Sequence, residues 1–100
     1  MLTNQGIINK EQILVKAVSN SIQVSKLIFN NVIVPYKIWL YKYNSSSGSD
    51  ITLIYTFELA AGDSVVDTNT YLLNTKDYLL AKTNVTNTTF IIESQDAADI

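Results

Sequence analysis

Apolar and polar side chains alternate most clearly between residues 50 and 67. At period two, apolar residues recur on one face of this stretch, which predicts a half-buried β-strand followed by a turn. Gly62 and Asp63 lie in that turn, since glycine tolerates a positive φ and an aspartate can accept backbone N–H groups. We expect Leu53 and Phe57 to be fully buried. The apolar positions are Ile51, Leu53, Tyr55, Phe57 and Leu59, with Ile54 as an exception on the other face.

Shorter alternating segments separated by polar turns predict further strands on both sides of this stretch. Together they indicate an all-β, single-domain antiparallel β-sandwich of about seven or eight short strands, of jelly-roll or immunoglobulin-like type. We expect residues 1–9 to form a flexible arm, or an edge strand exchanged with a neighbour, residues 10–93 to form the sandwich, and residues 94–100 to form an acidic tail. The expected strands are residues 11–18, 22–30, 32–43, 51–59, 64–67, 78–82 and 88–93, and residues 71–73 lead into a turn.

Two local details add to this picture. Strict alternation cannot place Val24 on the same face as Leu27 and Phe29, so a β-bulge is expected near Lys26. In addition, residues 59–66 and 73–80 share one pattern: a leucine, a turn, an aspartate four residues later and a new strand. We expect the aspartates, Asp63 and Asp77, to tie their turns through the carboxylate.

The segment 36–43 is apolar or aromatic on both of its faces. Tyr36, Ile38 and Leu40 share one face and supply the core. The other face is expected to be a protein interface, because Trp and Tyr dominate interface energetics. The alternatives are that Trp39 is core, or that the aromatic rings bind a carbohydrate or single-stranded bases. The expected interface residues are Lys37, Trp39, Tyr41 and Tyr43.

In the segment 78–82 we expect Leu79 and Ala81 to face one way, with Leu79 fully buried in the core. Tyr78, Leu80 and Lys82 are expected to face the other way.

The composition excludes several classes of chemistry. The chain has no cysteine and no histidine, so it lacks disulfides, thiolate sites and the commonest general base and metal ligand. Its seven basic residues are all lysines, which argues against sequence-specific nucleic-acid recognition. Ca²⁺ ligation by three aspartates and a glycosidase pair of Glu58 with Glu93 are weaker interpretations than turn capping and plain surface charge. We expect no catalytic residues, no metal and no cofactor. The three aspartates are Asp63, Asp67 and Asp77.

The charge is unevenly distributed along the chain. Residues 1–49 carry five lysines against one acid, a net +4, and residues 50–100 carry two lysines against eight acids, a net −6. This asymmetry is either chance or a sign of head-to-tail complementarity between copies. No apolar run is long enough to span a membrane, and the N-terminus does not have the pattern of a signal peptide.

The chain contains, in order, Val24-Ser-Lys-Leu-Ile-Phe-Asn-Asn31, a strand of the Ile38-Trp39-Leu40 type, a Ser/Gly loop, the Phe57-Glu-Leu-Ala-Ala-Gly-Asp63 turn and a segment from Leu73 through Asp77-Tyr78 to Leu79. This order of elements resembles small β-sandwich virion proteins of tailed bacteriophages. The resemblance implies a non-enzymatic structural component, present in many copies, and we expect a capsid auxiliary or decoration protein first. The alternatives are a neck or tail ring protein and, from another class, a carbohydrate-binding β-sandwich.

The same resemblance implies partners and a location. The partners would be further copies of the chain or the major capsid, neck or tail proteins, without a membrane. The location would be the virion, assembled in the host cytoplasm.

Overall fold

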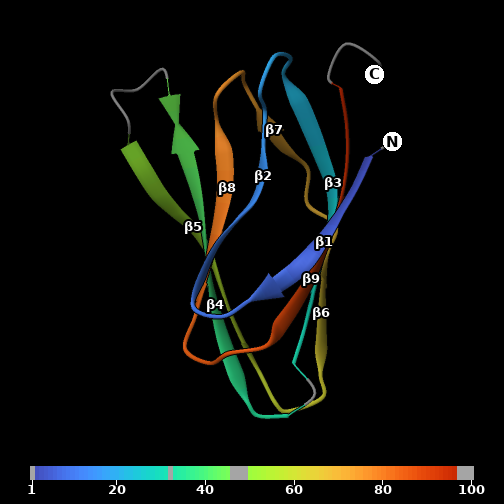
Figure 1. Ribbon diagram of the computed structural model, residues 1–100, viewed down its shortest axis with the longest axis vertical. Coiled ribbons are helices and arrows are strands. Elements are labelled where there is room, and N and C mark those ends of the chain that lie inside the picture. Colours follow the sequence, from blue (N-terminus) through green and yellow to red (C-terminus); the bar gives the residue numbers. More distant parts are fainter. Residues whose placement is uncertain (1, 32, 46–49, 97–100) are drawn as a thin grey trace.

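The computed structural model describes residues 2–31, 33–45 and 50–96. In this part of the chain nine β-strands follow one another (Figure 1). Among these residues there is no helix of the length and apolarity that a membrane crossing needs. The strands are β1 (Leu2–Ile8), β2 (Glu11–Lys16), β3 (Ile22–Asn30), β4 (Tyr36–Asn44), β5 (Asp50–Leu59), β6 (Ser64–Asp67), β7 (Tyr71–Leu73), β8 (Tyr78–Thr83) and β9 (Thr88–Asp96).

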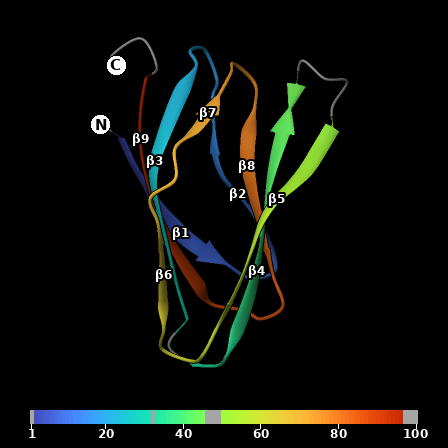
Figure 2. The same ribbon diagram turned by 180° about the vertical axis from the view of Figure 1, so that it is seen from behind.

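The strands form two antiparallel sheets that face each other, as Figures 1 and 2 show from opposite sides. Sheet A has the order β1-β9-β3-β6, and β7 also pairs with β3. Sheet B has the order β2-β8-β4-β5. Two sheets are needed because each has an apolar face that must be buried against another layer. The prediction of an antiparallel β-sandwich is therefore confirmed.

The core lies between the two sheets and takes one set of alternating side chains from most strands. Sheet A supplies Val24, Leu27, Phe29 and Ile92, and sheet B supplies Leu79 among others. Leu79 is 0% exposed, as expected. Further core residues of sheet B and its flanks are Leu14, Val15, Ala17, Tyr36, Ile38, Leu40 and Ala81.

The bulge expected in β3 is present at Ser25. Val24 lies opposite Ser94 and Lys26 lies opposite Glu93, so Ser25 is the additional residue. This one-residue insertion shifts the alternation and allows Val24, Leu27 and Phe29 to be buried on the same face.

The phase predicted for β5 is wrong in its first half. Leu40 lies opposite Tyr55 and Tyr41 lies opposite Leu53, so Ile54 is an additional residue that forms a second bulge. Before the bulge, Leu53 points to the outside of the sandwich and is 48% exposed rather than buried. After the bulge, Phe57 points inward, although it is partly rather than fully buried.

The sandwich extends beyond the expected limits of residues 10–93. Residues 2–8 are not a flexible arm but form β1, which pairs with β9 of the same chain along its whole length. Ile8 is buried, and Gly6 lies beneath the ring of Phe90, where an added Cβ would come within 3.0 Å of the ring. At the other end, β9 continues to Asp96. Residues 97–100 of the expected tail lie outside the described residues.

The two echoing segments form the same turn. Gly62 and Lys76 occupy equivalent positions with φ of 84° and 77°. The next N–H closes each turn, from Asp63 to the carbonyl of Ala60 at 3.1 Å and from Asp77 to that of Asn74 at 2.9 Å. The carboxylates differ, however. Asp77 ties its turn through the side chain, whereas the hydrogen bonds described for Asp63 use its backbone N–H and carbonyl.

Candidate protein-binding face

β4 presents its expected interface residues on the outer side of sheet B. Its inward residues Tyr36, Ile38 and Leu40 are buried, and the residues between them are half-buried at the surface. Because successive side chains of a strand point to opposite faces, the outward set is fixed by the buried one. The structure therefore brings together all four residues expected at an interface, Lys37, Trp39, Tyr41 and Tyr43.

The neighbouring strands continue this outer surface with more apolar residues. The pairing of sheet B aligns side chains in rows that run from β2 through β8 and β4 to β5. We call the apolar members of these rows the aromatic face: Ile13, Trp39, Tyr41, Tyr43, Ile51, Leu53, Tyr78 and Leu80. The three rows are Glu11–Lys82–Trp39–Thr56, Ile13–Leu80–Tyr41–Leu53 and Lys16–Tyr78–Tyr43–Ile51.

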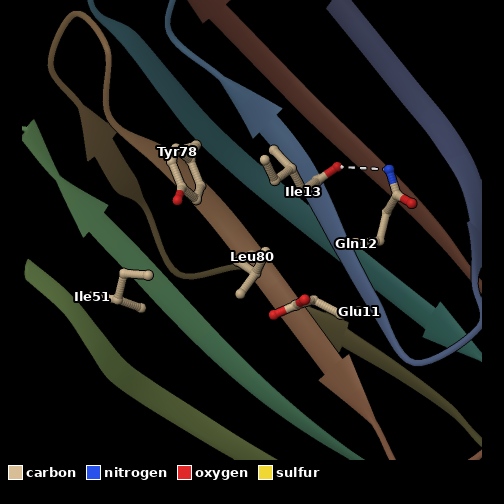
Figure 3. A pocket seen from close by; sticks show the side chains of 6 residues that line it. All are labelled: Glu11, Gln12, Ile13, Ile51, Tyr78 and Leu80. Carbon is tan, nitrogen blue, oxygen red and sulfur yellow. Dashed lines mark hydrogen bonds between the residues drawn. The ribbon is translucent and has the colours of Figure 1, made fainter. Parts of the chain in front are cut away.

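The aromatic face is packed at its centre. Leu80 points outward, yet it is only 8% exposed. The rings of Tyr43 and Tyr78 stack with centroids 4.6 Å apart and an angle of 15° between their planes. Figure 3 shows Ile13, Tyr78, Leu80 and Ile51 projecting from the same side of the sheet, around a shallow hollow of about 420 Å³. Most antiparallel sheets expose a polar outer face, so this face is unusual.

Charged side chains border the aromatic face at its Trp39 end and pair with one another. The Nζ of Lys37 lies 3.3 Å from a carboxylate oxygen of Glu58, and the Nζ of Lys82 lies 3.6 Å from one of Glu11. The same two ammonium groups lie 5.2 Å from ring centroids, Lys37 from Trp39 and Lys82 from Tyr41. An apolar centre with a charged, internally paired rim has the composition of a protein–protein interface.

The carboxylates of Asp67 and Asp77 serve as turn acceptors. Asp67 accepts the N–H of Asn69 at 2.9 Å and the hydroxyl of Tyr71 at 2.5 Å. Burial and the Asp67 carboxylate raise the pKa of Tyr71 to about 12, so the phenol stays protonated. Asp77 is almost fully buried and accepts the N–H and hydroxyl of Ser45 and the N–H of Asn74, at 2.8, 3.0 and 3.1 Å.

These hydrogen bonds control the ionisation of Asp77. Burial by itself would raise the pKa of its carboxyl group, but the bonds from Ser45 and Asn74, with the charge of Lys42, outweigh burial and lower the pKa. The turn therefore holds a carboxylate in its ionised form.

The carboxylates considered for hydrolytic chemistry lie apart. Glu58 is on β5 of sheet B and pairs with Lys37. Glu93 is on β9 of sheet A, opposite Lys26. Two acids on different sheets, each beside a lysine, do not form the facing pair that glycoside hydrolysis needs.

Sequence reasoning found the β4 part of the aromatic face and missed the rest. Alternation predicts that Tyr78 and Leu80 share the outward side of their strand, and this pattern could have identified them as part of the aromatic face. Ile51 and Leu53 are predicted to alternate with their neighbours without a break, and the bulge at Ile54 changes their face. Ile13 faces outward because a further bulge, at Leu14, shifts the alternation of β2.

No protein-family model matches the sequence, and no curated protein does. Among solved structures the fold is similar to the nucleoplasmin-like N-terminal domain of Drosophila FKBP39, with a TM-score of 0.58, 9% identity, and coverage of 95% of this chain and 88% of that one. A chain of the infectious bursal disease virus Gx strain gives a TM-score of 0.49 and 10% identity, over 89% of this chain and 29% of that one. The xylan-binding domain CBM22-1 of Paenibacillus barcinonensis Xyn10C gives a TM-score of 0.49 and 8% identity, over 94% of this chain and 90% of that one.

At 9% identity the similarity to the nucleoplasmin-like domain shows the fold alone. The chain is an antiparallel β-sandwich domain with an apolar outer face on sheet B.

Proposed function

We propose that this chain is a non-enzymatic structural protein that works through multi-copy protein–protein contacts made by the aromatic face. One observation carries the proposal: both faces of sheet B are apolar, and sheet A covers only the inner one. Contiguous exposed apolar patches are rare on soluble monomers and usually mark a partner surface.

The specific role we propose is that of a capsid auxiliary or decoration protein in a tailed-bacteriophage virion. The sequence resemblance supports this role, and the aromatic face supplies the contact surface that such a protein requires. The partner would be the major capsid protein, and the location would be the virion, assembled in the host cytoplasm. A neck or tail ring protein would use the same face against a different partner.

The rings of the aromatic face favour a protein partner over a carbohydrate. A sugar stacks on an open ring face. Here Trp39 carries the ammonium group of Lys37, Tyr41 carries that of Lys82, and Tyr43 is stacked on Tyr78. These contacts leave the surface apolar but cover ring faces that a sugar platform would need, so we do not propose carbohydrate binding.

The virion role is tested by measuring the amount of this chain in purified particles. Quantitative mass spectrometry against the major shell protein should find the chain in many copies for a capsid auxiliary protein. A copy number in the range of a single ring would favour the neck or tail role. Particles that lack the chain would contradict both.

Trp39→Ala separates an interface role from a structural one. Since Trp39 is half-buried on the outer face, we expect the isolated domain to lose only about 1 kcal/mol of stability, comparable to a surface cation–π contact. Binding to particles should weaken by about 2 kcal/mol or more, as at an interface hot spot. Leu72→Ala is the matched control, because Leu72 is 51% exposed on the outer side of sheet A. Equal binding of both variants would contradict the proposal.

A further inference from the structure

The edge of sheet B at β5 has the features of a strand that accepts another strand. In the described part of the chain β5 pairs with β4 and with no other strand (Figure 1). It is ten residues long, and its residues 51–59 contain neither lysine nor proline, the residues that commonly protect edges. Its outer edge therefore presents a row of backbone donors and acceptors.

The side chains of β5 are exposed on both sides of the sheet. Ile51 and Leu53 lie on the outer side, in the aromatic face, at 52% and 48% exposure. Tyr55 follows the bulge, lies opposite the inward residue Leu40, and is 48% exposed. A partner docked on the outer face covers Ile51 and Leu53 but cannot reach Tyr55. A strand added beside β5 covers all three.

We propose that this added strand is β5 of a second copy, paired antiparallel. In the pairing that uses the full strand, residue numbers of opposite partners add to 109, so that Leu53 lies opposite Thr56 of the second copy. Directly opposite residues must share a face. In an uninterrupted strand the faces alternate at every residue. Two residues whose numbers add to an odd total, such as 109, would then lie on opposite faces of the sheet and could not pair.

The bulge at Ile54 removes this conflict. The residues of β5 that face outward are Ile51 and Leu53 before the bulge and Thr56 and Glu58 after it. All four lie opposite outward residues of β4. With a sum of 109, Ile51 lies opposite Glu58 and Leu53 opposite Thr56, all on the outer side. The two bulges meet at the twofold axis, where Ile54 lies opposite Tyr55. The phase of β5 is thus self-complementary.

The charges permit the same pairing. β5 contains two charged residues. Asp50, its first residue, lies opposite Leu59 of the second copy, and Glu58 is paired with Lys37 of its own chain. Antiparallel pairing places the two copies of Glu58 at opposite ends of the strand pair, each opposite an isoleucine. Parallel pairing in register would place them side by side, which is unfavourable. The result is a sheet of eight strands that joins two aromatic faces into one surface. Because Tyr55 lies outside the aromatic face, this pairing does not depend on the proposed function.

Disulfide trapping tests the pairing directly, since the chain has no cysteine of its own. A mixture of the Leu53→Cys and Thr56→Cys variants should form a cross-linked dimer under mild oxidation, and each variant alone should cross-link much less. Efficient cross-linking of Leu53→Cys alone, or none in the mixture, would overturn the proposed pairing. Thermal melting of both variants verifies that they fold.

Sedimentation equilibrium supplies a second test that does not need cysteine. The wild-type chain should dimerise, and Tyr55→Lys should weaken dimerisation about tenfold or more, because it places a charge at the centre of the contact. Val66→Lys is the control, since Val66 is 53% exposed on β6, an edge strand of sheet A, and it should dimerise normally. A wild-type chain that stays monomeric would overturn the proposal. If the wild-type chain stayed monomeric and Tyr55→Lys weakened particle binding, the edge of β5 would pair with a strand of another protein in the particle. Loss of particle binding in Trp39→Ala with intact dimers would leave both proposals standing.

Discussion

Lys76 holds a backbone conformation that side chains other than glycine rarely adopt. Its φ is 77°, and its N–H donates to the carbonyl of Ala17, which fixes the turn between β7 and β8. The equivalent position of the other turn is Gly62, at a φ of 84°. A left-handed conformation costs a residue with a Cβ about 1–2 kcal/mol.

Lys76→Gly should therefore stabilise the domain by about 1 kcal/mol, after the larger backbone entropy of glycine in the unfolded chain is subtracted. The denaturant midpoint measures the change. Thr75→Gly is the control at a neighbouring position without a positive φ, and it should not stabilise. A destabilised Lys76→Gly variant would show that the Lys76 side chain contributes more than its backbone costs.

Asp77 predicts a specific dependence of stability on pH. Its pKa is lowered from the ordinary value of 3.8, so the folded state binds its proton less tightly than the unfolded state does. The contribution to stability is therefore complete above the unfolded pKa and is lost as pH falls through the lower folded pKa. Asp77→Asn should cost about 2 kcal/mol at neutral pH, because buried donors lose a charged acceptor, and much less in strong acid.

Urea unfolding of Asp77→Asn at neutral and acidic pH tests this expectation. Asp63→Asn is the control, because Asp63 is exposed and its described hydrogen bonds use the backbone. That variant should change stability by less than about 0.5 kcal/mol, as most surface substitutions do. An equal loss in both variants at every pH would contradict the assigned role of the Asp77 carboxylate.

At the scale of the elements, local pattern was sufficient where turns and alternation agree. The spans expected for residues 22–30 and 64–67 agree with β3 and β6. The bulge in β3 could be inferred because the misplaced residue, Val24, is apolar among polar neighbours. The bulge in β5 could not, because Ile54 lies between apolar residues on both sides and either phase appears reasonable. When a strand carries apolar residues on both faces, the sequence pattern does not indicate which of them face the core.

An alanine series along β5 and β8 tests the corrected phase. Leu79→Ala should cost about 3 kcal/mol because it leaves a cavity in the core. Phe57→Ala should cost about 2 kcal/mol, since Phe57 packs against Phe29 and Tyr55 but is partly exposed. Leu53→Ala, on the outer side, should cost less than about 1 kcal/mol. Denaturant midpoints rank the three losses of stability. A loss for Leu53→Ala as large as that for Leu79→Ala would show that Leu53 is buried in the core, as uninterrupted alternation predicts.

In the whole molecule, strand pairing determines which residues lie beside each other on a face, and the sequence pattern does not predict this. The two faces of β4 were predicted from alternation alone, but the residues beside them come from strands distant in the chain, and long-range pairing leaves no local signal. The two ion pairs do not remove the charge asymmetry along the chain. Lys37 pairs with Glu58 and Lys82 with Glu11, so each half of the chain supplies one lysine and one acid to them.

Oxidative footprinting shows whether the aromatic face is the surface that binds the particle. Hydroxyl radicals modify exposed side chains, and mass spectrometry compares the rate at each residue in the free chain and in the assembled particle. We predict that Trp39, Tyr41 and Ile13 lose most of their reactivity on assembly, while Val66 and Leu72 on the outer side of sheet A keep theirs. Unchanged reactivity at Trp39 and Tyr41 in the particle would show that the aromatic face is not the contact surface.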